Sequence, residues 1–313
     1  MSGSVGLVDT SCLTADDCWT VGAYFTGKQL ATANGLIEHY NGRTWAPATI
    51  PDPVGAAFSG IYCTSPRDCV AAGSRQTSKV SAVALIYKWD GKSWSDVATP
   101  NPTGALWAEL DSVHCFSATE CLVLGDADNS VKASGYFFVE DFNGKSWALG
   151  AVKNTVQFNL GNETGLFGLS CPKANSCLAV GSALGYTHGE LGADFPAGVA
   201  EAWGGSTWKA VQVPRSPALG SYVTYQDSCL APGNCWAVAG YPGIVGMDHP
   251  VPLLHWNGTS FSVTTLGMHG YMAAIGCLNT ASGAWCVTLG ESVSKSKGAP
   301  NQPRASFAGG YFA

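Results

Sequence analysis

S-C-L-T-A-D-D-C-W-T-V-G at residues 11–22, followed after a polar loop by L-I-E-H-Y-N-G-R-T-W at 36–45, is the stretch that decides the fold. Similar stretches recur along the chain, and each contains a pair of cysteines. The first cysteines of successive pairs are 51, 52, 56, 58 and 48 residues apart. A self-similar period of about fifty residues indicates an array of equal structural units. The pairs are Cys12 with Cys18, Cys63 with Cys69, Cys115 with Cys121, Cys171 with Cys177, Cys229 with Cys235, and Cys277 with Cys286.

Each repeat predicts four β-strands, as the second repeat illustrates. S-G-I-Y-C at 59–63 leads into the first cysteine, C-V-A-A-G at 69–73 follows the second, and A-L-I-Y-K-W at 84–89 comes next. Such short apolar runs bounded by turn residues favour buried strands over helices. An Asp-Gly turn then predicts a hairpin, because both residues tolerate positive φ. The expected fourth strands begin at Trp45, Trp94, Trp147, Trp208 and Phe261.

Four antiparallel strands repeated six times form the blade pattern of a β-propeller. We therefore predict an all-β, six-bladed propeller that spans residues 1–313 as one domain. The sixth repeat reads only to a third strand, so that either blade six has three strands or the natural chain continues past Ala313. The expected blades are residues 1–52, 53–103, 104–155, 156–215, 216–266 and 267–313.

Composition excludes several classes of function. The net charge of −6 and the pI near 5.4 show no basic footprint for nucleic acid. No apolar run reaches the roughly 18 to 20 residues that a membrane-spanning helix needs.

All twelve cysteines belong to the pairs within repeats. A zinc site needs two pairs on one metal, whereas a disulfide needs only the partner across a hairpin, with Cα atoms about 5.5 Å apart. We therefore predict one hairpin disulfide per blade and export to an oxidising compartment. The opening M-S-G-S-V-G is not a signal peptide, so we expect that a leader was removed or omitted.

The S-C-x5-C-W-x-V-G element with its W-N-G-x-S-W-like turns resembles a family of secreted, actinobacterial-type β-propeller repeat proteins, most of unassigned function. The likeness covers essentially the whole chain. The D-G-K-S-W turn at 90–94 is similar to the Asp-box of sialidases, which is a structural element there. A sialidase would also need three arginines that grip a carboxylate, a tyrosine nucleophile with a glutamate, and an aspartate acid. No local motif brings together three of the five arginines, which are Arg43, Arg67, Arg75, Arg215 and Arg304.

We expect the repeated residues to be structural and the unrepeated residues to carry binding or catalysis. Both hairpin types with repeated signatures fall on one face of a propeller, and their tryptophans are interpreted as packing residues rather than sugar platforms. The opposite face carries the variable loops, where function usually lies. His39 and His255 stand beside the repeated turns and are interpreted as structural, and His114 adjoins Cys115 on the same face.

The candidate site lies over blades three to five on the variable face, with further residues from blades two and six. The candidate catalytic residues are Asp126, Asp128, Glu190, Asp194, Glu291 and, as the base of a lyase, His188. The candidate ligand-binding residues are Tyr186, Trp107, Glu109, Asp111, Arg75, Tyr241, His249, Tyr271 and Arg304. His188 and His249 are more readily interpreted as solvated loop residues than as ligands.

No cofactor and no metal are expected. Asp126 and Asp128 form an Asp-x-Asp pair that falls short of a calcium ligand set and can instead cap a turn. The sequence contains no G-x-S-x-G, H-E-x-x-H, P-loop or dinucleotide fingerprint.

Three functions remain open. The first is an extracellular binding module that recognises a saccharide or a protein partner. The alternative is a carbohydrate-active enzyme, a glycoside hydrolase or a polysaccharide lyase, that uses carboxylates or histidine at the same face. A third is a structural propeller within a larger surface protein. Two candidate carboxylates close together in one pocket, one with a raised pKa, would favour the enzyme; scattered, solvated carboxylates would count against it.

Overall fold

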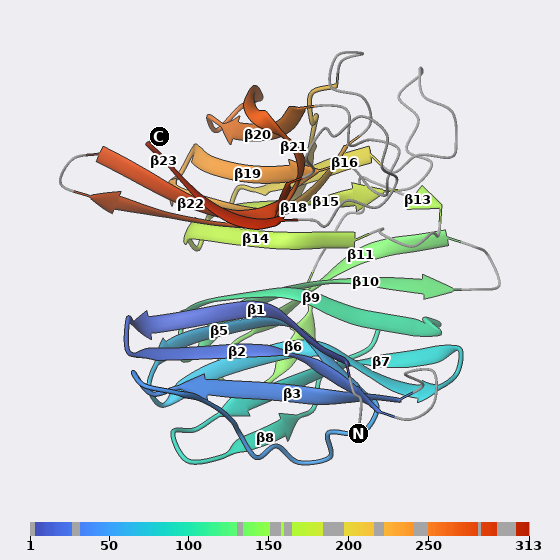
Figure 1. Cartoon of the computed structure of the whole chain (residues 1–313). Coiled ribbons are helices and arrows are strands. Elements are labelled where there is room, and N and C mark those ends of the chain that lie inside the picture. Colours follow the sequence, from blue (N-terminus) through green and yellow to red (C-terminus); the bar gives the residue numbers. More distant parts are fainter. Residues whose placement is uncertain are drawn as a thin grey trace, which may run out of the picture. The chain divides into compact units, whose positions relative to one another are not determined.

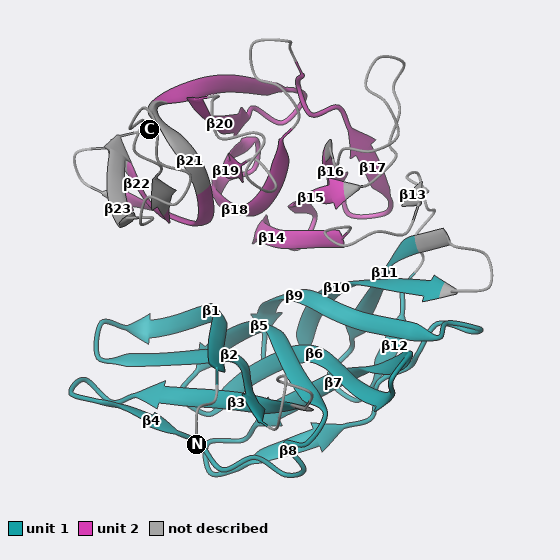
Figure 2. Cartoon of the chain, turned by 45° about the vertical axis from the view of Figure 1, so that its right-hand side comes forward, with its two compact units in different colours: residues 1–154 teal, residues 155–313 magenta. Residues whose placement is uncertain are grey.

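A computed structural model describes residues 4–26, 32–129, 134–150, 158–159, 165–183, 197–215, 222–240, 250–280, 283–292 and 305–312 (Figure 1). These residues form 23 strands and no helix. The chain divides into two compact units, Met1–Asn154 and Thr155–Ala313, which are described separately (Figure 2).

Unit 1 contains the first three repeats, each with four strands. Their bounds are β1 (Ser4–Thr14), β2 (Asp17–Thr26), β3 (Thr32–Tyr40), β4 (Trp45–Pro47), β5 (Ala56–Ser65), β6 (Asp68–Ser78), β7 (Ser81–Trp89), β8 (Trp94–Val97), β9 (Trp107–Ser117), β10 (Glu120–Asn129), β11 (Ser134–Phe142) and β12 (Trp147–Leu149).

Unit 2 contains repeats four to six. Its strands are β13 (Phe158–Asn159), β14 (Gly165–Lys173), β15 (Ser176–Ala183), β16 (Ala197–Trp203), β17 (Trp208–Val211), β18 (Val223–Ala231), β19 (Asn234–Gly240), β20 (Pro250–Trp256), β21 (Phe261–Thr280), β22 (Gly283–Ser292) and β23 (Ala305–Phe312). As predicted, the sixth repeat has a third strand, β23, paired with β22.

Within a repeat, consecutive strands pair antiparallel, and the fourth strands begin at the predicted aromatic residues. Two pairs of repeats are joined where separate sheets were expected. In unit 1, Ala82 of β7 pairs with Trp107 of β9, which links repeats two and three into one nine-stranded sheet. In unit 2, β21 serves both repeats five and six, because the 48-residue interval between their first cysteines is the shortest in the chain and leaves no room for a loop.

A β-bulge recurs on the first strand of all six repeats, four residues before the first cysteine. It lies at Val8, Ser59, Asp111, Phe167, Tyr225 and Ala273. In repeats one to four a glycine of the second strand faces this irregularity. A Cβ on Gly73 or Gly125 would stand 2.0 or 2.2 Å from a carbonyl oxygen of the first strand, so only glycine fits there.

The predicted hairpin turns have the expected backbone. Gly42, Gly91, Gly144, Gly205 and Gly258 have φ between 84° and 94°. In repeat two, Asp90 Oδ1 accepts hydrogen bonds from the amides of Lys92 and Ser93, both 2.8 Å long. The asparagines at the same position in repeats one, three and five accept the equivalent pair of bonds.

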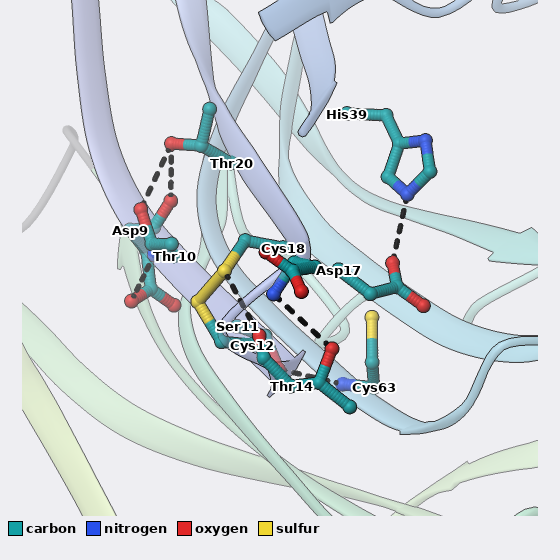
Figure 3. Close-up of a disulfide and its surroundings, with 11 residues drawn as sticks. Asp9, Thr10, Ser11, Cys12, Thr14, Asp17, Cys18, Thr20, His39 and Cys63 are labelled. Atoms are coloured by element: carbon teal, nitrogen blue, oxygen red, sulfur yellow. Dashed lines mark hydrogen bonds and ion pairs between the residues drawn. A yellow bond between two sulfur atoms is a disulfide. The ribbon is translucent and has the colours of Figure 1, made fainter. Parts of the chain in front are cut away.

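All six predicted disulfides are present, and their Cα atoms lie 3.9 to 4.1 Å apart. This is closer than the expected 5.5 Å, because the cysteines face each other directly across neighbouring strands, as Cys12 and Cys18 do (Figure 3). The sixth bridge spans nine residues of sequence rather than six. The bridges join Cys12 to Cys18, Cys63 to Cys69, Cys115 to Cys121, Cys171 to Cys177, Cys229 to Cys235, and Cys277 to Cys286.

The second cysteine of each of the six pairs is buried. Cys177, Cys235 and Cys286 of unit 2 are 5%, 3% and 3% exposed. Cys235 and Cys286 belong to the apolar cores of unit 2, so these two bridges also contribute to packing between repeats. The cysteines are therefore structural residues, as the sequence predicted, and they take no part in the candidate site.

The apolar cores lie between consecutive repeats. One core joins Val21 and Ile37 of repeat one to Phe58 and Ile61 of repeat two. A second core joins repeats two and three, a third joins repeats four and five, and a fourth joins repeats five and six. Burial of these faces is the main stabilising contribution in each unit.

The aromatic residues that open the fourth strands show how the repeats pack. Trp94 is buried against Trp19 of the preceding repeat, with ring centroids 5.3 Å apart. Trp147, Trp208 and Phe261 are also buried, which agrees with the predicted packing role. Trp45 differs from these residues, because it is 46% exposed.

Serine side chains also link neighbouring repeats. In three places, the serine before a first cysteine accepts a hydrogen bond of 2.9 to 3.0 Å from the amide of the next repeat's first cysteine. These pairs are Ser11 with Cys63 (drawn in Figure 3), Ser170 with Cys229, and Ser228 with Cys277. Among the described residues, no helix is long and apolar enough to cross a membrane.

Candidate functional site

The strongest concentration of candidate residues lies where β9 begins and β10 ends. Trp107, Glu109 and Asp111 belong to β9, and Asp126 and Asp128 belong to β10. Glu109 is directly opposite Asp126, and Trp107 is directly opposite Asp128. Side chains directly opposite each other share a face of the sheet, so the fold brings these residues together. We call the five residues the repeat-three acidic site.

Asp111 enters this group because of the bulge. It is the extra residue between Leu110 and Ser112, which pair with Gly125 and Leu124. A bulge redirects the side chain of the inserted residue. Asp111 is buried, and its Oδ2 atom receives no hydrogen bond from an N–H or O–H donor of the described residues.

Glu109 is held by two hydrogen-bond donors. Ser59 Oγ, from the bulge of repeat two, donates to Glu109 Oε1 over 3.1 Å. Trp107 Nε1 donates to Glu109 Oε2 over 3.3 Å. Both carboxylate oxygens therefore have a partner, and the indole of Trp107 is fixed beside the acids.

The carboxyl groups of Asp111 and Asp126 lie close enough to affect each other's protonation. Burial, followed by the nearby Asp126 and Glu109 charges, raises the pKa of Asp111 well above its usual range. Burial and the charge of Glu109 raise the pKa of Asp126 to about 7, although the bond from Asp111 acts in the opposite direction. Burial also raises the pKa of Asp128.

The other repeats show that these acids are not part of the scaffold. At the Glu109 position they carry Gly6, Ala57, Gly165, Val223 and Tyr271. At the Asp126 position they carry Ala23, Ser74, Ser182, Gly240 and Glu291. The two positions are paired in the same register in every repeat. The acids of repeat three are therefore additions to a common frame.

Repeat six brings together two other candidate residues. Tyr271 of β21 is directly opposite Glu291 of β22, at the positions that Glu109 and Asp126 occupy in repeat three. The sequence pattern named both residues but gave no sign that they are cross-strand partners.

The Arg75 side chain forms ion pairs and a hydrogen bond with neighbouring residues of unit 1. Its guanidinium contacts Asp52 at 2.6 Å, Asp96 at 3.2 Å and the hydroxyl of Tyr87 at 2.9 Å. The arginine thereby ties the connection between repeats one and two to strands β7 and β8.

Seven candidate residues lie outside the described part of the chain. They are Tyr186, His188, Glu190, Asp194, Tyr241, His249 and Arg304. Their roles stay predictions.

His39 and His255 each have a structural environment. His39 Nε2 lies 2.8 Å from Asp17 Oδ1. The imidazole ring of His39 stacks on Trp19, with the ring centroids 4.2 Å apart. His255 repeats this arrangement on Asn234 and Trp236, and burial lowers its pKa.

Ser59 is the residue of the site that sequence reasoning missed. It lies 50 residues from Glu109, and only the packing of repeat two on repeat three brings them together. Its position four residues before Cys63 matches that of Asp111 before Cys115, which is the one signal available in the sequence. Among the described residues, no three His, Cys, Asp or Glu side chains are placed to hold a metal ion.

No protein-family model matches this chain, and no curated protein matches it either. Similar solved structures include the α-L-arabinofuranosidase Arb93A of Fusarium graminearum, with a TM-score of 0.58 and 9% identity over 98% of this chain and 93% of that chain. The α-L-arabinanase of Penicillium chrysogenum has a TM-score of 0.56 and 11% identity over 91% and 88% of the two chains. A protein of unknown function from Dyadobacter fermentans has a TM-score of 0.58 and 11% identity over 98% and 94%.

The arabinanase and the arabinofuranosidase are β-propeller proteins. At these identities the likeness concerns the fold. The chain is thus an all-β repeat protein that resembles propeller glycosidases in architecture and carries one disulfide in each repeat.

Proposed function

We propose that the protein binds a saccharide at the repeat-three acidic site. The observation that carries this proposal is the convergence of Trp107 and four acidic side chains at positions where the other repeats have mostly small or apolar residues. Carboxylates accept hydrogen bonds from sugar hydroxyls, and an indole offers a flat apolar face for a sugar ring.

A hydrolase is the second candidate, and one specific observation favours it. Burial raises the pKa of Asp126 to about 7, and the neighbouring Glu109 side chain accepts hydrogen bonds from Ser59 and Trp107. Near neutral pH, Asp126 can give its proton to the oxygen of a glycosidic bond while water adds to the anomeric carbon and Glu109 accepts the proton that the water loses. A raised pKa on one of two neighbouring carboxyls suits the general acid of a glycoside hydrolase.

The two candidates differ in what Asp126 does. A panel of neutral plant, fungal and bacterial polysaccharides, assayed for binding by affinity electrophoresis and for hydrolysis by released reducing ends, separates them. In a binder, Asp126→Asn weakens retention and no reducing ends appear with any variant. In a hydrolase, Asp126→Asn and Glu109→Gln each lower turnover by about a hundredfold or more.

The matched control is Asp90→Asn, in the turn of repeat two. Asparagine already occupies this position in repeats one, three and five, so the variant should bind and turn over saccharide like the natural protein. If no polysaccharide is retained or cleaved, both candidates fail.

The broader setting is also part of the proposal. The six repeats are taken as six blades of one propeller, in a protein exported to an oxidising compartment and similar to secreted bacterial repeat proteins. The equal repeats, the six disulfides and the match to propellers over more than nine-tenths of the chain support it. Denatured protein from the native source should contain no titratable thiol, and free thiols would contradict export.

A further inference from the structure

We propose that the repeat-three acidic site selects an amino sugar, that is, a saccharide carrying a protonated amine, over neutral and acidic saccharides. The inference rests on the saccharide-binding function proposed above and narrows it to one chemical class. It follows from the charge, the donor and acceptor inventory, and the proton balance of the site.

The charge of the site lacks a counterion among the described residues. Four carboxyl groups, those of Glu109, Asp111, Asp126 and Asp128, lie on two neighbouring strands. None of them takes part in the ion pairs of His39 with Asp17, of Arg75 with Asp52 and Asp96, or of Lys88 with Asp68. A cationic group would therefore supply the missing counterion, and an anionic sugar would be repelled.

The hydrogen-bonding capacity of the site points the same way. Glu109 already receives bonds from Ser59 and Trp107. Asp111 is about nine-tenths buried, and its Oδ2 receives no bond from any N–H or O–H donor of the described residues. A ligand can reach the partly exposed carboxyls of Glu109, Asp126 and Asp128, and it must bring hydrogen-bond donors to them. An ammonium group brings three donors together with a positive charge, whereas a sugar hydroxyl brings one donor and no charge.

The proton balance gives the inference a distinctive signature. Asp111 and Asp126 retain protons because they are buried beside other acids. A bound ammonium favours the ionised carboxylates, so its arrival should displace a proton from this pair. A neutral saccharide would bind without proton release.

The experiment uses three oligosaccharides with one backbone: a β-1,4-linked glucosamine hexamer, its fully N-acetylated counterpart, and the N-acetylated hexamer oxidised to carboxylates at C6. Each is titrated into the full chain by calorimetry at pH 6 in two buffers of different ionisation enthalpy. We expect the amine to bind at least about tenfold tighter than the neutral hexamer, with proton release, and the carboxylate to bind weakest. The preference should shrink as salt is raised.

Two variants locate the effect. Asp126→Asn and the more exposed Asp128→Asn should each reduce the preference for the amine, and Asp126→Asn should also reduce proton release. Asp90→Asn should retain both. If Asp126→Asn does not fold, as judged by thermal unfolding, Asp128→Asn alone carries the test.

The outcomes separate the two proposals. Equal binding of amine and neutral hexamers, or preference for the carboxylate, overturns the inference and leaves saccharide binding standing. Retention of a neutral polysaccharide from the panel, with no binding of the amine, has the same meaning. Failure of every saccharide overturns both.

Discussion

Repeats two and three have the same strand register and bulge, but they carry different side chains around that bulge. Both have a bulge four residues before the first cysteine, and both have a glycine whose Cβ would lie 2.0 or 2.2 Å from a carbonyl oxygen. Where repeat two has Ala57, Ser59 and Ser74, repeat three has Glu109, Asp111 and Asp126. Backbone contacts constrain the glycine, whereas the bulge and its neighbours tolerate new chemistry. Repeat three therefore carries acidic side chains that repeat two lacks, on the same backbone frame.

The largest effect should come from the glycines, and it should be equal in the two repeats. Gly73→Ala and Gly125→Ala each push a methyl group into a backbone carbonyl, so each should lower the free energy of unfolding by about 4 kcal/mol. Gly6→Ala is the control, because no atom lies within 4 Å of its Cβ position. Denaturant unfolding measures all three. Tolerance of one substitution but not the other would show that the repeats do not share this frame.

A smaller effect should distinguish the repeats by pH. Glu140 of repeat three is fully buried, and burial raises its pKa from 4.5 to about 7, whereas Tyr87 at the same position in repeat two does not ionise in this range. Because folding raises the pKa, the stabilisation from the protonated group is complete below about pH 4.5 and is lost as pH rises through 7. The loss is about 3 kcal/mol at pH 8.

Unfolding of Glu140→Gln between pH 4.5 and 8 checks this loss. The variant should lose less stability than the natural protein as pH rises, while its glutamine oxygen can still accept the bond from Thr99. Tyr87→Phe, which removes the hydroxyl bonded to the Pro51 carbonyl, should cost the same amount at every pH in this range. Parallel curves for Glu140→Gln and the natural protein would refute the assigned burial cost.

Removal of the disulfide should lower the free energy of unfolding by the same amount in repeats two and three. Replacing Cys63 and Cys69 together, or Cys115 and Cys121 together, by serine opens a loop of about seven residues. The expected cost is about 2 kcal/mol in each case by the chain-entropy account. Thermal unfolding of the two double variants tests it, and a much larger loss in repeat three would link the bridge to the acidic site.

The smallest effect concerns the contact between the repeats. Ser59→Ala removes the bond to Glu109 and should cost about 1 kcal/mol, as should Ser11→Ala, which removes the bond from the Cys63 amide. Only Ser59→Ala should also weaken saccharide binding, because Ser59 orients Glu109. Equal binding by both variants would reduce Ser59 to a structural residue.

Much of the frame was predictable from the sequence because its causes are local. The turn after Trp89 needs a side-chain acceptor and a glycine at positive φ. Asp90 and Gly91 meet these needs, and both can be recognised in the sequence. The cysteines of a pair are close in sequence, so their pairing needs no knowledge of distant contacts. The continuity of β21 was missed because apolar spacing does not reveal where one strand continues into the next.

The site was predictable only as a set of residue types. Asp126, Asp128, Glu109 and Asp111 stood out because they interrupt a repeated pattern. Their order of protonation could not be foreseen, since it depends on burial and on the bulge that turns Asp111 toward Asp126. The partnership of Ser59 with Glu109 needed the packing of one repeat on the next.

The sequence by itself therefore determined the repeat, its strands, its turns and its six disulfides, because residues a few positions apart decide each of them. Only the tertiary structure decided which acids raise one another's pKa, which serine holds Glu109, and why a glycine must face the bulge. Those features arise where strands and repeats meet, and the electrostatic cost of burying a carboxyl is set by everything packed around it.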